Sequence, residues 1–203
     1  MNDSAPPLRE IRALHTAHTL RVYQAYSPEI ALPALAAQRF VSPFKRTRMT
    51  WIKPSFTWMM YRAGFASKAG QEHILAIEIT REGFEWALAH SCISHFDPAF
   101  HRDSGAWRSD LSHASVRIQW DPERDLKLQP LPWRSLQIGL SAEAITAYVD
   151  RWIVRIDDVT ALSRELEALI AAREYERAEA LRPAEHRYPL PSPLAARIGC
   201  TDA

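Results

Sequence analysis

The chain has 203 residues, and 47% of them are hydrophobic, which suffices for the core of one domain of ordinary size. Its 25 basic and 24 acidic residues give a formal net charge of +1, which argues against binding duplex DNA through a broad basic face. No run of about 18 apolar residues occurs, so we expect no membrane span. The N-terminal residues 1–10 are polar and show no secretory signal pattern. The two cysteines, Cys92 and Cys200, are far apart in the sequence and match no metal-binding spacing. We therefore expect a cytoplasmic protein with reduced thiols, a single disulfide being the alternative.

The first third of the chain predicts a strand followed by a helix. Residues 1–10 read as a flexible lead, and alternating β-branched and aromatic residues predict a strand over Leu20–Tyr26. Ser27, with Pro28 behind it, is a typical helix start. Phe40–Arg48 then reads as a loop that ends in a basic cluster.

The stretch Arg48–Arg62 combines a strand-to-helix junction with two Trp, three Met, a Phe and a Tyr. We expect a strand over Met49–Lys53, a break at Pro54, and a helix capped by Ser55. Such a junction leaves backbone N–H groups within reach of a ligand. The apolar density is typical of a pocket wall, and more often of a core.

The remaining elements alternate strands with short helices. His73–Thr80 is the clearest strand, whereas residues 91–113 show no period and predict a long loop. A strand over Ser115–Trp120 should end in a turn at Asp121–Arg124, because Asp and Pro lead that segment. We further expect a helix at Arg81–Ala89, a strand at Arg134–Leu140, a helix from Ser141 to Val149, a strand at Trp152–Ile156, and a solvated helix over Thr160–Leu181.

This order of elements predicts one α+β domain with a split or bent, mostly antiparallel sheet flanked by helices. The domain should cover residues 11–182. Residues 183–203 hold several prolines and are expected to be extended, either packed on the domain or exposed.

Two motifs carry a family resemblance. Arg48–Ser55 (RMTWIKPS) and Gln119–Arg124 (QWDPER) resemble the DUF4291 family, a domain of unknown function, and the resemblance runs from about Ile11 to Ile198. The family name implies no activity.

A second resemblance is to the ADP-ribosyltransferase fold. Val22–Tyr26 stands where that fold has its first strand, Trp51–Ser55 matches its strand-Pro-Ser-helix unit, and Gln137 falls on a strand that would close the site. The resemblance implies a cleft for NAD. Gln24 replaces the usual His, however, and Gln137 replaces the usual Glu, so transferase activity is left open.

The candidate site follows from this resemblance and from the cations beside it. NAD would be a substrate, no metal is expected, and the acceptor of ADP-ribose would be a protein or RNA. The candidates are Gln137 as the catalytic residue, Arg21, Gln24, Tyr26, Trp51, Lys53 and Ser55 as NAD-binding residues, and Arg48 and Arg134 as phosphate-binding residues.

Two other functions fit the same sequence. The basic and aromatic cleft would also suit a non-catalytic module that binds a phosphorylated small molecule or an RNA end. The proline-rich tail would suit an interaction protein. Structural roles stay open for single residues: a helix cap for Ser55, an ion pair with Glu29 or Asp157 for Arg21, and a buried hydrogen bond for Gln137.

Overall fold

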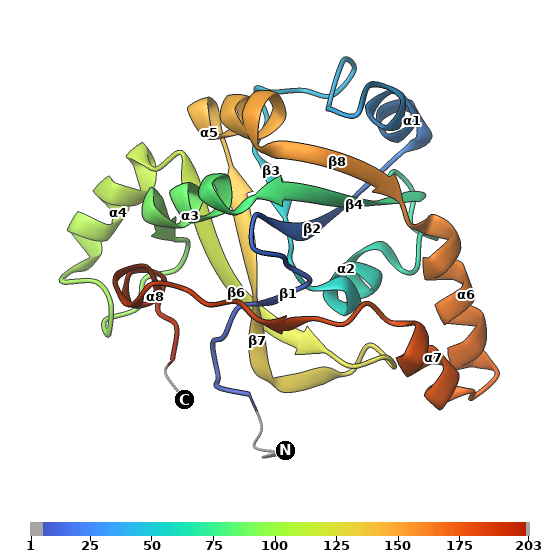
Figure 1. Ribbon diagram of the computed structural model, residues 1–203. Coiled ribbons are helices and arrows are strands. Elements are labelled where there is room, and N and C mark those ends of the chain that lie inside the picture. The colour runs from blue at the N-terminus through green and yellow to red at the C-terminus, as the bar shows by residue number, and fades with distance from the viewer. Residues whose placement is uncertain (1–5, 202–203) are drawn as a thin grey trace.

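The computed structural model describes residues 6–201 and has an α+β architecture, with helices on the outer faces of small sheets (Figure 1). The strands are β1 (Arg12–Ala13), β2 (Thr19–Tyr26), β3 (Thr50–Ile52), β4 (His73–Thr80), β5 (Ser91–Ile93), β6 (Val116–Arg124), β7 (Pro130–Leu140), β8 (Ile153–Asp158) and β9 (His186–Arg187). The helices are α1 (Pro28–Ala37), α2 (Phe56–Ala63), α3 (Arg81–Ala89), α4 (Ser104–His113), α5 (Ala142–Ala147), the π-helical turn η1 (Tyr148–Trp152), α6 (Thr160–Ala171), α7 (Tyr175–Leu181) and α8 (Ser192–Ile198).

Two sheets form the body of the protein, and among residues 6–201 one bridge joins them. One sheet has the order β2-β4-β8 and is antiparallel; the other has the order β3-β7-β6-β5 and is antiparallel except for the β5–β6 pair. The bridge joins Tyr23 of β2 to Lys53, the residue after β3. The Tyr23 N–H donates to the Lys53 carbonyl at 2.7 Å, and the Lys53 N–H donates back at 3.3 Å. This bridge sets the distance between the sheets at the position of Lys53.

The central strand β4 is buried on both faces, which explains its almost continuous apolar run. Leu75, Ile77 and Ile79 face a large core with α1, α3, α5 and the second sheet. Ile74 and Ala76 face a second core under α2 and α6. Since neighbouring strand residues point to opposite faces, a strand between two cores needs apolar residues at successive positions.

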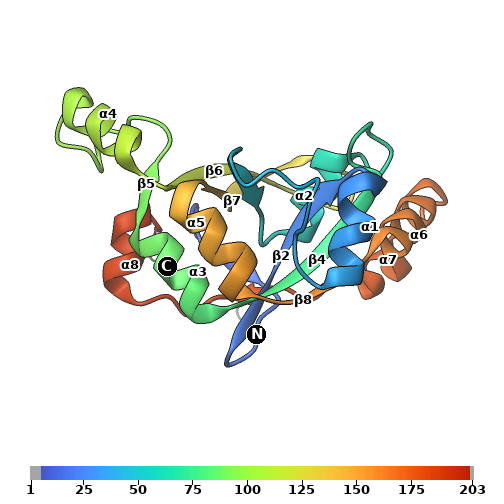
Figure 2. The ribbon, with the colours of Figure 1, turned by 90° about the horizontal axis from the view of Figure 1, so that it is seen from above.

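A predicted loop and a predicted turn are both wrong. Residues 91–113, expected to be a loop, contain β5 and α4; α4 has no buried residue and projects from the body (Figure 2). The turn expected at Asp121–Arg124 is instead the end of β6, with a bulge between Pro122 and Arg124. The partner strand explains this difference, because β7 begins at Pro130 and pairs with Arg124, so the chain reverses only after β6.

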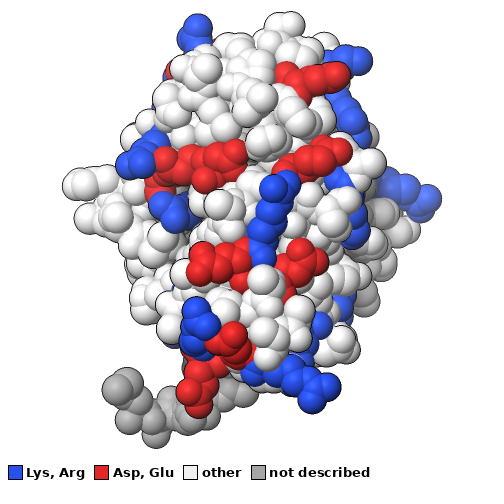
Figure 3. All heavy atoms as spheres, turned by 90° about the vertical axis from the view of Figure 1, so that its right-hand side faces the viewer, with Lys and Arg blue, Asp and Glu red and all other residues white. Residues whose placement is uncertain are grey.

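The predicted helix over Thr160–Leu181 is two helices, α6 and α7. They are separated at residues 172–174, where Arg173 has a φ of 62°. Such a left-handed residue ends the helical hydrogen-bond ladder. The face that α6 and α7 present carries Lys and Arg side chains interspersed with Asp and Glu (Figure 3), as expected for a solvated surface.

The C-terminal segment is part of the packed body. β9 pairs with β1, and Tyr188 and Ile198 are buried in the large core. Instead of the extended chain expected from its prolines, Ser192–Ile198 forms α8, which ends at Gly199 with a φ of 71°. Of the predicted lead and tail, the structure describes residues 6–10 and 183–201. Residues 1–5 and 202–203 lie outside the described chain. No helix among the described residues is long and apolar enough to cross a bilayer.

Candidate functional site

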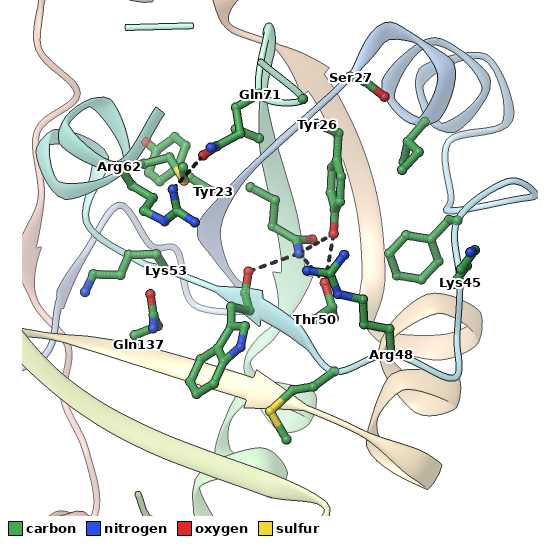
Figure 4. Close-up of a pocket in the computed structure, with 18 of the residues that line it drawn as sticks. Tyr23, Tyr26, Ser27, Lys45, Arg48, Thr50, Lys53, Arg62, Gln71 and Gln137 are labelled. Carbon is green, nitrogen blue, oxygen red and sulfur yellow. Dashed lines mark hydrogen bonds between the residues drawn. The ribbon is translucent and has the colours of Figure 1, made fainter. Parts of the chain in front are cut away.

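A cavity of about 750 Å³ lies beside the Tyr23–Lys53 bridge (Figure 4). Its walls come from β2, from β3 and the loop before it, from α2, and from the two glutamines that face each other on β6 and β7. The lining includes five aromatic residues, which are Tyr23, Tyr26, Phe44, Trp51 and Trp58. A ligand can therefore meet large apolar faces and polar groups in one space.

The charged side chains in the described lining are all basic. It includes Lys45, Arg48, Lys53 and Arg62, and no Asp or Glu among the residues that the structure describes. Lys53 pairs with Asp121 behind the wall, whereas the other three cations have no carboxylate within 4.0 Å in the described chain. The Arg62 side chain donates a long hydrogen bond of 3.4 Å to Gln71. The cavity therefore offers cationic groups that an anionic ligand could pair with.

Lys53 is the most constrained of these cations. It is 1% exposed, its Nζ lies 3.5 Å from the centroid of the Trp58 ring, and it donates to Asp121 Oδ2 at 3.1 Å. Burial disfavours the ammonium form and lowers the Lys53 pKa to about 8, although Asp121 acts in the opposite direction. The Trp58 face and Asp121 together compensate the buried charge.

Gln24 is buried and its side chain is fully used by the protein. The Gln24 Oε1 accepts from the Tyr148 hydroxyl at 2.8 Å. Its Nε2 lies 2.7 Å from Thr50 Oγ1, 2.9 Å from the Tyr26 hydroxyl and 3.0 Å from the Trp51 carbonyl. Because a carbonyl only accepts, this contact requires the amide nitrogen on that side. Gln24 therefore supports Tyr26 and Thr50 from its place in the cavity lining.

Gln137 faces Gln119 across the β6–β7 pair. The Gln137 Nε2 donates to Gln119 Oε1 at 2.8 Å, and both side chains line the cavity. This contact leaves the Gln137 oxygen and the Gln119 amide hydrogens available to a ligand. The pair is neutral, so it supplies hydrogen bonds without a negative charge.

The sequence was compared with known protein families and with curated proteins. The model of the family described as Domain of unknown function (DUF4291) matches residues 10–188. The chain belongs to the DUF4291 family. No curated protein matches it.

In this DUF4291 protein, most of the predicted site residues come together. Six of the nine line the cavity: Gln24, Tyr26, Arg48, Trp51, Lys53 and Gln137. They come from β2, from β3 with the residues that flank it, and from β7. The Tyr23–Lys53 bridge joins β2 to the β3 segment, and the β3–β7 ladder adds Gln137.

The other three predicted residues lie outside the cavity. Arg21 pairs with Glu78 across the β2–β4 ladder at 2.7 Å, and not with Glu29 or Asp157. Ser55 is the N-cap of α2: its Oγ accepts from the Trp58 N–H at 3.1 Å and donates to Glu123 at 2.8 Å. Arg134 donates to the Trp120 carbonyl at 3.0 Å. Each already has a partner within the protein, which accounts for its position.

Sequence reasoning missed Arg62, Thr50 and Gln71. Arg62 lies four residues after Trp58 on α2, so helical spacing places both on one side of the helix. That spacing could have identified Arg62 once Trp58 was considered as a wall residue. Gln71 lies in the connection between α2 and β4, where the sequence has no periodic pattern that would assign it. Among the described residues no group of His, Cys, Asp and Glu is arranged to hold a metal ion.

Proposed function

We propose that this DUF4291 protein binds a nucleotide in the cavity, with NAD as the first candidate ligand. One observation carries the proposal: the described lining has four cationic side chains, five aromatic rings and no carboxylate. A nucleotide has the complementary chemistry, since its phosphates pair with Arg and Lys and its base stacks on aromatic faces. The volume also lies within the range of about 300–1,000 Å³ that is usual for small-molecule sites.

The fold supports the same ligand through the resemblance to ADP-ribosyltransferases. The resemblance assigns an NAD cleft to Gln24, Trp51 and Gln137, and these three residues line one cavity. Transfer of ADP-ribose to a protein or RNA would pass through a cation-like ribose, which a nearby carboxylate would stabilise. The Gln119–Gln137 pair has no such charge, so the geometry favours binding over transfer.

Calorimetric titration with NAD, ADP-ribose and AMP tests the proposal. Saturable binding that is weakened in Arg48→Ala and Arg62→Ala would support it, because both side chains line the cavity. Arg164→Ala is the matched control, since it removes an exposed arginine of α6 outside the cavity lining. If none of the three nucleotides binds, the proposed function is refuted.

A second candidate is a non-catalytic module for a phosphorylated ligand such as an RNA end. The specific observation in its favour is that Lys45, Arg48 and Arg62 have no carboxylate partner in the described chain. This function predicts steep salt dependence and no turnover of NAD. Both candidate functions involve a small anionic ligand. For either function, we propose that the protein is located in the cytoplasm.

A further inference from the structure

We propose that the ligand of this cavity is a nucleotide with two separate phosphoryl groups, one bound at each end of β3. This inference rests on the proposed nucleotide-binding function and names its ligand class. The geometry points to it because the unpaired cations are divided between two places. Lys45 and Arg48 lie before β3, and Arg62 lies on α2 near the residues that follow β3 (Figure 4).

The backbone positions that carry the two groups of cations are separated along β3. β3 has three residues, and at about 3.3 Å per residue it separates its flanks by roughly 10 Å. Figure 4 shows Arg62 and Gln71 on one side of Thr50 and Lys45 on the other, while the Arg48 side chain runs from the side of Lys45 to Thr50. A single phosphoryl group at either end would leave the cations of the other end without a counter-charge.

The two ends differ in their neutral surroundings. At the first end, Arg48 lies near the Tyr26 hydroxyl, which also contacts Thr50 Oγ1 at 2.8 Å. At the second end, the charge of Lys53 is already compensated by Asp121, so Arg62 is the cation without a carboxylate partner in the described chain. One phosphoryl group at each end would therefore match the available positive charge.

The space between the ends suits a nucleoside. Trp51 and Thr50 of β3 lie there, and the Gln119–Gln137 pair offers both a donor and an acceptor to hydroxyl or base groups. A nucleoside 3′,5′-bisphosphate has the required order of groups: phosphate, ribose with its base, phosphate. A pyrophosphate such as that of NAD, held at one end, would not use the cations at the other, so we expect the bisphosphate to bind more tightly than NAD.

The experiment is a set of calorimetric titrations with three adenosine ligands, the 5′-monophosphate, the 3′-monophosphate and the 3′,5′-bisphosphate. Wild type, Arg48→Ala, Arg62→Ala and the control Arg164→Ala are each titrated, and circular dichroism checks that they fold. We expect the bisphosphate to bind wild type and the control at least about tenfold more tightly than either monophosphate, since a charge-assisted hydrogen bond contributes on that scale. In each cavity variant, the bisphosphate should gain affinity over only one of the two monophosphates. Arg48→Ala and Arg62→Ala should differ in which of the two phosphates no longer contributes to binding.

Two patterns of binding would overturn the inference while the proposed function stands. One is binding of the monophosphates with no further gain from the second phosphate. The other is loss of the same phosphate contact in both variants, which would show that the cations serve a single anionic group. If none of the three ligands binds although NAD or ADP-ribose does, the inference fails and the proposed function stands. If NAD and ADP-ribose also fail to bind, the proposed nucleotide site itself is refuted, and the inference falls with it.

Discussion

Replacing Lys53 with Met should change how the stability of the protein depends on pH. Lys53 is almost fully buried, and its folded-state pKa of about 8 lies below its ordinary value of 10.5. The folded state therefore binds the proton less tightly than the unfolded state does. Below pH 8 the buried ammonium reduces the free energy of unfolding, and this penalty disappears as the pH rises from 8 to 10.5.

The size of the penalty follows from the lowered pKa. A difference of about 2.5 units, at 1.36 kcal/mol per unit, corresponds to about 3 kcal/mol. The Trp58 ring beneath the Nζ favours the charged form by about 1 kcal/mol and reduces the effect. Between pH 7 and pH 10 we expect the stability of wild type relative to Lys53→Met to increase by about 2 kcal/mol.

Urea denaturation followed by tryptophan fluorescence, at several pH values from 7 to 10, measures this difference. Tyrosines whose pKa is raised by burial, such as Tyr26 and Tyr148, titrate in both proteins and cancel in the comparison. Lys45→Met is the control for removing one positive charge from an exposed position of the same cavity. Parallel stability curves for wild type and Lys53→Met would refute the argument that burial lowers the Lys53 pKa.

Three further predictions concern residues that position the cavity or support it. Glu185 accepts a hydrogen bond from the Phe56 N–H at the N-terminus of α2, and its burial raises its pKa to about 8. The folded state therefore holds the Glu185 proton more tightly than the unfolded state, and wild type should lose stability relative to Glu185→Gln as the pH rises from 4.5 to 8. Thermal unfolding at pH 5 and pH 8 checks this; equal shifts in both proteins would contradict it. Gln24→Leu should destabilise by about 2–4 kcal/mol in urea denaturation, because it leaves the buried Tyr148 hydroxyl without its acceptor; an unchanged midpoint would count against the network. Gly139→Ala should destabilise by about 1–3 kcal/mol, because the new Cβ would lie 2.9 Å from the Trp51 ring and 2.8 Å from the sulfur of Met49; an unchanged melting temperature would contradict it.

Local patterns were sufficient for several elements. His73–Thr80 is a strand with the predicted bounds, and Ser55 caps α2 as its position before an apolar run indicated. In both cases the evidence is contained in a few neighbouring residues: a continuous apolar run, or a hydroxyl that reaches an N–H three residues away. The same kind of evidence failed at Asp121–Arg124, where pairing with β7 overrides the preference of Asp and Pro for a turn.

The sequence by itself determined the α+β class, the family and the residue types from which the cavity is built. Only the tertiary structure decided which of those residues face it. Arg48 lines the cavity without a carboxylate partner in the described chain, whereas Arg21 pairs with Glu78 outside it. The physical reason is that an exposed cation and a paired cation have the same local sequence signature, because the partner that neutralises a charge is supplied by a strand or helix distant in the chain.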